Sequence, residues 1–293
     1  MKLKSLPIIA LLLCLPFSNS IKDNSWHEGL IENVALDELS GLAASAKYKN
    51  LYWGINDSGN KPFLFALQSN GRHIGKVAIN GAKTRDIEAL AIGNCTFARK
   101  CIFIADIGDN DLERRQARIL IAPEPSPRAL SVQIKQIIYV QYPDGPHDAE
   151  AMMVHPKTQK IYVIEKLMRE FTNRNARVFE VPEISSNQKD AHVTLKPVSS
   201  LARTDAKNNS TGPFTDASFL NHQSGFYIRD YRRIYRVNGE IGIKEPLELS
   251  PIKAPPMMQG EAIAVSINDN ELVLSSEGRH AAIATINIET INE

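Results

Sequence analysis

The hydrophobic residues of this chain fall into short runs that are rich in β-branched and aromatic side chains. Gly, Pro, Asn and Asp separate these runs, and no long amphipathic helical pattern with capping residues interrupts them. Short strands bounded by turn-forming residues produce such a pattern, whereas a surface helix would repeat its apolar positions every three or four residues. The chain is therefore predicted to be an all-β protein.

A two-part unit recurs five times along the chain. It opens with an acidic residue followed by a small and then an apolar one, and it continues into a strand-like run that ends in a charged residue. The first parts lie at residues 38–43, 86–91, 148–153, 215–219 and 260–264, and the second parts at 51–57, 101–106, 160–165, 225–230 and 271–277. Repetition of one supersecondary unit at this period is typical of propellers and other repeat folds.

Each unit continues with further strand-like runs. Third runs lie at residues 63–67, 118–122, 177–181, 233–237 and 282–288, and outer runs lie at 74–79, 134–142, 192–198 and 244–249. The fifth unit ends without an outer run, and residues 29–36 supply a candidate from the start of the chain. We therefore predict a β-propeller of five four-stranded blades whose ring is closed by an N-terminal strand. A sixth blade in a divergent stretch and a β-sandwich are the less favoured alternatives.

Residues 1–20 have the pattern of a signal peptide. Two lysines precede an apolar run at residues 6–17, and small residues suited to cleavage end at Ser20. The apolar run is too short to span a bilayer, which makes a membrane anchor the weaker reading, and no later segment is apolar enough to span. We predict one propeller domain at residues 21–293 that is exported to the periplasm or secreted.

Export would leave a nearly neutral chain. Removing Lys2 and Lys4 takes the 34 basic residues to 32, against 33 acidic residues, so the mature net charge is −1. This balance argues against a general electrostatic affinity for nucleic acid or anionic lipid. The expected partner is a small-molecule ligand or another envelope protein.

Cys95 and Cys101 are the two cysteines that remain after export. They flank residues 96–100, between two strand-like runs, and no His or Cys lies nearby to complete a metal site. In an oxidising compartment two cysteines this close most often form a disulfide. We predict a disulfide that staples a hairpin.

Several motifs carry a resemblance to a known group of proteins. They read ELSGL at residues 38–42, WGINDSG at 53–59, DIEA at 86–89 and ADIGDN at 105–110. The chain resembles the phytase-like and SdiA-regulated secreted bacterial propellers in these motifs, most clearly over residues 38–165. The resemblance implies the propeller fold. The denser acidic motifs of calcium-dependent propeller phytases have no match here, so phytase catalysis is not carried over.

One acidic residue per unit serves as the anchor of the alignment: Glu38, Glu88, Glu150, Asp216 and Glu261. Because the innermost strand of each blade lines the central channel, these carboxylates are predicted to face a common axis. Three arrangements would offset their repulsion: a bound Ca²⁺ with oxygen ligands, basic partners such as Lys166 or Arg229, or hydrogen bonds from backbone N–H groups. The acids are accordingly candidate metal ligands, and Ca²⁺ is the candidate cofactor.

His147 and His280 are candidate general bases, because each lies three residues from an acidic motif residue. A surface-loop histidine is the competing explanation for both. Serine-nucleophile, zinc-protease, phosphate-loop and dinucleotide motifs are absent from the sequence. The favoured hypothesis is a binding module of the cell envelope, and the alternative is a calcium-dependent hydrolase of phosphoesters, esters or lactones.

Overall fold

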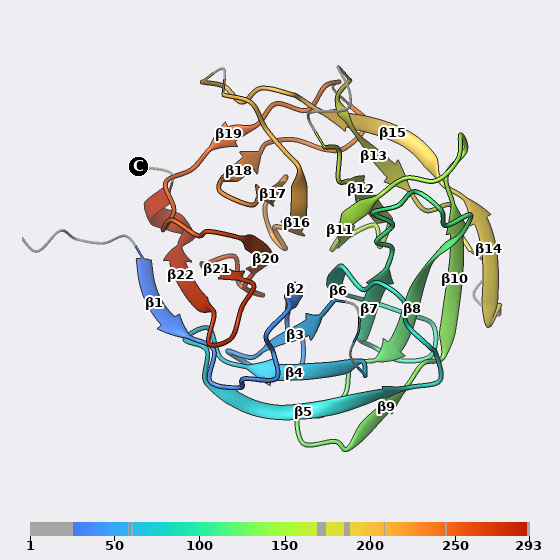
Figure 1. Ribbon diagram of the computed structural model, residues 1–293, viewed down its shortest axis with the longest axis vertical. Helices are drawn as coiled ribbons and strands as arrows, with labels where there is room; N and C mark the ends of the chain where they lie inside the picture. Colours follow the sequence, from blue (N-terminus) through green and yellow to red (C-terminus); the bar gives the residue numbers. More distant parts are fainter. Residues whose placement is uncertain are drawn as a thin grey trace, which may run out of the picture.

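The computed structural model describes residues 26–291, apart from 58, 60, 169–173, 185–187, 208 and 244. The predicted signal peptide therefore lies outside the described residues. The described strands form five sheets arranged as blades around a central axis (Figure 1). The prediction of a five-bladed all-β propeller is confirmed.

Every blade runs from an inner strand at the axis to an outer strand at the rim, with antiparallel neighbours. Blade 1 contains β2 (Leu39–Ala44), β3 (Tyr52–Asn56), β4 (Phe63–Leu67) and β5 (His73–Asn80). Blade 2 contains β6 (Ala89–Gly93), β7 (Cys101–Asp106), β8 (Ala117–Pro123) and β10 (Gln136–Gln141). Blade 3 contains β11 (Ala149–Val154), β12 (Ile161–Glu165), β13 (Ala176–Glu180) and β15 (Lys196–Leu201). Blade 4 contains β16 (Phe214–Phe219), β17 (Phe226–Asp230), β18 (Ile234–Val237) and β19 (Ser250–Pro251). Blade 5 contains β20 (Gly260–Val265), β21 (Glu271–Ser276), β22 (Ala282–Asn287) and β1 (Trp26–Leu30).

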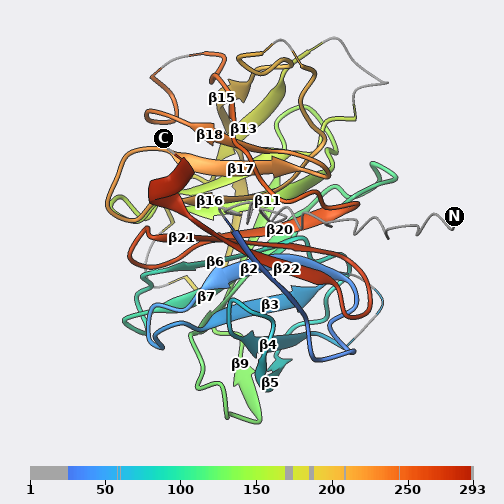
Figure 2. The same cartoon turned by 90° about the vertical axis from the view of Figure 1, so that its left-hand side faces the viewer.

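The N-terminal strand closes the ring as predicted, but it starts earlier in the chain. β1 pairs antiparallel with β22, with Trp26 opposite Ile286, and Figure 2 shows the two strands side by side. The strand ends at Leu30, because Asn33 then forms a turn in which its side chain accepts the N–H of Ala35. In the rest of the predicted segment, residues 31–36, Ile31 and Leu36 pack between blades 5 and 1, whereas Val34 and Ala35 are exposed.

Two blades carry a fifth strand that the repeat pattern did not predict. β9 (Ser131–Gln133) pairs in parallel with β5 of blade 1, and β14 (Asp190–Thr194) pairs in parallel with β10 of blade 2. Each comes from the connection of the following blade and reaches back over its neighbour (Figure 1). The added strands cover two sheet edges that would otherwise expose unpaired backbone groups.

The hydrophobic core consists of five clusters, one between each pair of adjacent blades. Residues on the inner strands must be small where blades meet closely. A Cβ on Gly41 of β2 would lie 2.7 Å from the backbone nitrogen of Leu90 on β6. The chain ends in a short 3₁₀-helix, Ile288–Ile291. Among the described residues, no helix has the length and apolar character needed to cross a membrane.

The predicted disulfide is present. Cys95 and Cys101 are bonded, with their Cα atoms 5.9 Å apart, and they join the loop after β6 to the start of β7. Cys101 is fully buried against the core between blades 2 and 3.

Reduction of this disulfide is expected to lower the free energy of unfolding by about 2 kcal/mol, because the closed loop is short. Intact mass with and without reductant, followed by urea unfolding of both forms, measures the bond and its contribution. A Cys95→Ser, Cys101→Ala double variant should unfold like the reduced protein and should be insensitive to reductant. Two free thiols in protein purified without reductant would contradict the prediction.

Candidate functional site

Four of the five inner strands begin with a β-bulge at the same end of the channel. The register shifts fall at Ser40, Glu150, Thr215 and Glu261. In blade 2, Ala105 is the strand partner of Ala89, and its carbonyl also accepts the N–H of Glu88. Glu88 and Ala89 thus lie opposite one residue, and Glu88 occupies the position equivalent to the bulge residues of the other blades. A bulge inserts one extra residue opposite a single partner, so it can re-aim a side chain without ending the strand.

This geometry corrects the predicted alignment of the five acids. Glu88, Glu150 and Glu261 occupy the bulge position, but Ser40 and Thr215 occupy it in blades 1 and 4. Glu38 lies two residues before its bulge and Asp216 one residue after. The sequence alignment matched the nearest acid in each unit, whereas the bulge sets the true equivalence. The five carboxylates therefore do not form one ring of equivalent residues.

An acidic cavity of about 220 Å³ opens at this end of the channel, with residues from all five blades in its wall. Its lining residues are Ser40, Asp57, Asp86, Glu88, Asn110, Glu150, Lys166, Tyr231, Gln259, Glu261 and Glu277. Six of these eleven carry carboxyl groups, against one ammonium group, so the cavity is strongly rich in hydrogen-bond acceptors. We call it the acidic cavity.

Glu38 and Asp216, the other two predicted acids, lie next to this cavity rather than in its wall. Glu38 hydrogen-bonds to Asp57, which is a lining residue. Asp216 is fully buried, and its carboxylate accepts the N–H of Ala217 at 2.8 Å and the N–H of Ile263 at 2.8 Å. Because Ile263 belongs to the next blade, Asp216 joins blades 4 and 5. Its charge is therefore offset by hydrogen bonds from backbone N–H groups, the third of the arrangements that the sequence suggested.

The acids of the cavity wall differ in how well they are paired. Ser40 donates to Glu88 Oε2 at 2.8 Å, and Lys166 forms an ion pair with Glu150 through Oε1. Glu150 Oε2 has no hydrogen-bond partner, and the Glu150 side chain is only 8% exposed. A buried carboxylate oxygen without a donor is costly. Asp57 Oδ1, in the same cavity wall, is also buried without a partner, so two lining residues have an acceptor left over.

Burial and mutual repulsion raise the pKa values of the cavity acids. Burial, and then the charges of Glu38 and Glu277, raises the pKa of Asp57 to about 7. Burial and the charge of Glu277 raise the pKa of Glu261 to about 7. Burial raises the pKa of Glu150 to about 8, although the ammonium of Lys166 opposes the shift. Asp57 and Glu261 therefore keep their protons to a higher pH than solvated carboxyls do, whereas Glu150 is ion-paired with Lys166.

Lys166 is the cation that holds this end of the channel together electrostatically. Burial opposes its charged form, but the charge and hydrogen bond of Glu150, together with those of Tyr231, raise the pKa of Lys166 above its usual value. Its Nζ lies 5.6 Å from the centre of the Tyr231 ring. Arg229, the other basic partner that we considered, is fully buried and donates to the carbonyls of Ala262 and Ser275 in blade 5.

Within the described residues, no group of three or more His, Cys, Asp or Glu side chains has the arrangement of a metal site. The one ammonium in the cavity wall, Lys166, takes the place next to Glu150 that a bound cation could occupy. Ligation of Ca²⁺ by Glu38, Glu88, Glu150, Asp216 and Glu261 stays a prediction. If calcium binds, Glu88, Glu150 and Glu261 are the predicted ligands whose side chains line the cavity.

Neither candidate histidine lines the acidic cavity. His147 is enclosed by charged groups, with Nε2 2.9 Å from Asp144 Oδ1 and Nδ1 2.9 Å from Glu165 Oε1. His280 is exposed, and its Nδ1 lies 3.1 Å from the carbonyl oxygen of Ile31. A catalytic role for either residue stays a prediction.

The loop after β7 reaches the cavity because Gly108 has no side chain. A Cβ there would lie 2.3 Å from Glu88 Oε1 and 2.5 Å from Asp86 Oδ2. Arg114 fixes the loop from behind by donating to the carbonyl of Gly108 at 2.7 Å. The ADIGDN motif at residues 105–110 therefore has a structural role, and it contributes Asn110 to the cavity wall.

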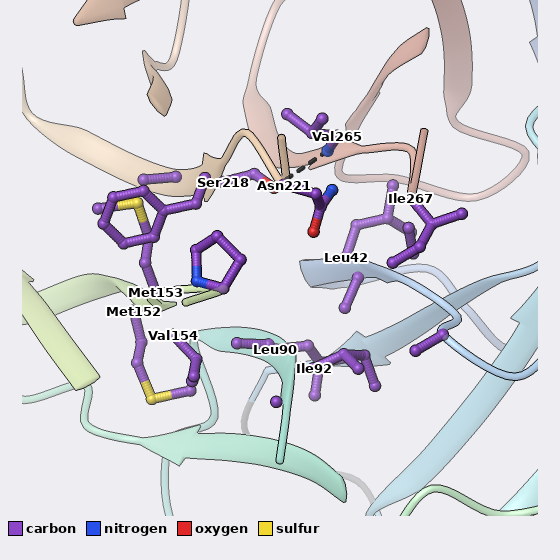
Figure 3. Close-up of a pocket in the computed structure, with 18 of the residues that line it drawn as sticks. Leu42, Leu90, Ile92, Met152, Met153, Val154, Ser218, Asn221, Val265 and Ile267 are labelled. Atoms are coloured by element: carbon purple, nitrogen blue, oxygen red, sulfur yellow. Dashed lines mark hydrogen bonds between the residues drawn. The ribbon is translucent and has the colours of Figure 1, made fainter. Parts of the chain in front are cut away.

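The opposite end of the channel is different in character. Figure 3 shows a smaller cavity, of about 90 Å³, where the inner strands end. Apolar side chains such as Leu42, Leu90, Met152 and Val265 line it, and Ser218 Oγ accepts the N–H of Val265 at 3.0 Å. The carboxyl groups that line these two cavities therefore all belong to the acidic one.

The sequence analysis missed several cavity residues. Lys166, Tyr231 and Glu277 each directly follow the second strand of a blade, as Asp57 does in blade 1. The sequence analysis names Lys166 only as a possible basic partner and Asn110 only within the ADIGDN motif, and it assigns no role to Tyr231 or Gln259. Their shared place in the repeat was a readable signal, because equivalent positions in successive blades face the same end of the channel.

Fold and site together define a five-bladed propeller with an acidic channel mouth. No protein family and no curated protein sequence matches this chain. Among solved structures, a glutaminyl cyclase from Myxococcus xanthus is similar at 8% identity, with 89% of this chain and 95% of that chain covered and a TM-score of 0.50. A gluconolactonase from Xanthomonas campestris is similar at 9% identity, with 85% and 72% covered and a TM-score of 0.46. At these identities the similarity shows the propeller fold alone.

Proposed function

We propose that this protein is an exported ligand-binding propeller of the cell envelope. Its ligand is a small molecule or ion that carries positive charge or donates hydrogen bonds, and it occupies the acidic cavity. The observation that carries this proposal is the buried, unpartnered Glu150 Oε2 in a cavity whose wall contains six carboxyl groups and one ammonium.

The size of the cavity favours a small ligand over a protein partner. Its volume of about 220 Å³ lies below the range of about 300–1,000 Å³ that is usual for drug-sized ligands. Because its acids come from four of the five blades, a cation there would reduce repulsion between several blades at once. The resemblance of the motifs to phytase-like secreted propellers, together with the disulfide, supports an exported protein.

The alternative function is a cation-dependent hydrolase of phosphoesters, esters or lactones. One observation favours it: the pKa values of Asp57 and Glu261, both about 7, suit groups that exchange protons at neutral pH. Assays with p-nitrophenyl phosphate, p-nitrophenyl acetate and a γ-lactone, with calcium and with chelator, test this alternative. Turnover that Glu261→Gln abolishes would replace the binding proposal by the hydrolase.

Calorimetric titration tests the binding proposal directly, with calcium chloride and ethylammonium chloride as separate probes. We expect at least one to bind, and we expect Glu150→Gln to weaken binding at least tenfold because a charged acceptor is lost. Glu289→Gln makes the same charge change at an exposed site and should leave the affinity unaltered. Absence of binding by both probes, or equal affinities in the three proteins, would contradict the proposal.

A further inference from the structure

A second, larger cavity adjoins the acidic one. It has a volume of about 860 Å³ and is lined by Asn110, Asp111, Leu112, His147, Asp148, Glu165, Lys166, Leu167, Met168, Arg174 and Tyr231. Three of these residues, Asn110, Lys166 and Tyr231, also line the acidic cavity, so the two share a wall. We call the larger cavity the outer pocket.

Three charged groups of the outer pocket, Arg174, His147 and Glu165, are paired with one another, and the carboxyls of Asp111 and Asp148 also line the wall. Arg174 forms an ion pair with Glu165 through its guanidinium, and His147 Nδ1 lies 2.9 Å from the same carboxylate. Hydrogen bonds from these partners outweigh the effect of burial and lower the pKa of Glu165 to about 2. The apolar part of the wall, to which a hydrocarbon group could bind, comes from Leu112, Leu167 and Met168.

Two of these apolar side chains are exposed, and the loop around Leu112 is held in a conformation that keeps its side chain exposed. Leu112 is 53% exposed and Met168 is 37% exposed. The backbone of Leu112 has φ of 54°, a left-handed conformation that leucine rarely adopts. Asp109 holds this turn: its carbonyl accepts the N–H of Leu112 at 2.9 Å, and its carboxylate accepts the N–H of Arg114 at 2.8 Å. The loop thus presents a leucine to the pocket instead of burying it.

The acidic cavity and the wall that it shares with the outer pocket together have features that bind an ammonium group. Glu150 Oε2 offers a buried acceptor that has no partner. Tyr231 already has one ammonium, that of Lys166, 5.6 Å from its ring centre, and an aromatic ring of this kind attracts a second cation in the same way. An acceptor-rich head site therefore continues directly into an apolar pocket.

We infer that the acidic cavity and the outer pocket form one site for an amphipathic amine. The ammonium group lies in the acidic cavity against Glu150, and a hydrocarbon or aromatic part lies in the outer pocket against Leu112, Leu167 and Met168. This inference rests on the proposed function and specifies the chemical class of its ligand.

A matched series of probes tests the inference: n-hexylammonium, ethylammonium, 1-hexanol and hexanoate, titrated by calorimetry into the full mature chain. Each methylene buried in an apolar site contributes about fourfold in affinity, so hexylammonium should bind on the order of 100-fold more tightly than ethylammonium. Hexanol, which lacks the charge, should bind more weakly than hexylammonium. Hexanoate should not bind, because its charge repels the cavity acids.

Variants assign the tail to the outer pocket. Leu112→Asn keeps a residue that tolerates the left-handed backbone, and Met168→Gln keeps side-chain length. Each should weaken hexylammonium binding about tenfold or more and leave ethylammonium binding unchanged. Leu130→Asn is the control, because Leu130 is 92% exposed and does not line the pocket.

The outcomes separate this inference from the proposed function. If hexylammonium binds no more tightly than ethylammonium, or if both pocket variants bind it as the wild type does, the inference is wrong and the proposed function stands. If calcium alone binds, with dependence on Glu150, the site is an ion site and the inference is again wrong. If none of the probes binds, both fail.

Discussion

Deleting residues 26–36 is expected to open the propeller ring and to remove most of its stability. The deletion takes away β1, which pairs with β22 along its whole length, and the two fully buried side chains of Ile31 and Leu36. Loss of each large buried side chain costs about 2–5 kcal/mol. Together with the lost strand, this approaches the total of about 5–15 kcal/mol that stabilises an ordinary domain. Circular dichroism during heating and denaturant unfolding measure the loss.

Two smaller variants separate the contributions of the strand and the buried residues. A deletion of residues 26–30 removes β1 alone, whose side chains are partly or fully exposed, and should cost less than the full deletion. An Ile31→Ala, Leu36→Ala double variant keeps the strand and should cost about 4–10 kcal/mol. An unchanged melting temperature after the full deletion would show that the ring closes without this segment.

Five blades could be predicted from the sequence because every unit repeats the same strand pattern with the same turn-forming residues. Ring closure could be predicted because the last unit lacked an outer strand. The exact strand could not, because residues 31–36 are more apolar than Trp26–Leu30 and gave the stronger strand signal. That apolar character reflects burial between blades 5 and 1 rather than strand pairing.

The two added strands, β9 and β14, lie beyond what repeat periodicity can predict. Each is short or partly exposed, with burial confined to alternate residues such as Val132 and Ala191. Their parallel partners belong to the preceding blade, so no local pattern connects the two strands. Such long-range pairing depends on where the connection passes in space, and one unit of sequence does not contain that information.

The sequence predicted acids at one end of the channel, but it did not predict which residue of each blade occupies the equivalent position. Acids at the start of each unit were visible in the sequence, and three of the five anchor residues line the cavity. The bulges that set the register were not visible, because Ser40 and Thr215 take that position without a charge. Because the sequence alignment matched acidic residues, it was displaced by two residues in blade 1 and by one residue in blade 4.

Replacing Lys166 is expected to have the largest effect of any single substitution in the cavity. Its ammonium is the one positive charge among the side chains that line the cavity, and its ion pair with Glu150 is more than nine-tenths buried on both sides. Removing one partner of a buried pair leaves an uncompensated charge and costs about 3–5 kcal/mol. The carboxyls around it can reduce that cost only by taking up protons, which makes the cost depend on pH.

Lys166→Met should therefore lose about 3–5 kcal/mol of unfolding free energy at pH 8 and clearly less at pH 5, measured by denaturant unfolding in buffer with chelator. Folding raises the pKa of Glu150 from 4.5 to about 8 and the pKa values of Asp57 and Glu261 to about 7. A carboxyl whose pKa is raised by folding stabilises the fold while it is protonated, and this stabilisation is lost as pH rises through the folded pKa. Stability should thus fall between pH 5 and pH 8 in the wild type, and more steeply in Lys166→Met because Glu150 then lacks its counterion.

Glu150→Gln added to Lys166→Met removes the unpaired charge and should restore most of the loss at pH 8. A loss that is equal at both pH values, or one that Glu150→Gln does not reduce, would show that Lys166 contributes packing rather than charge compensation.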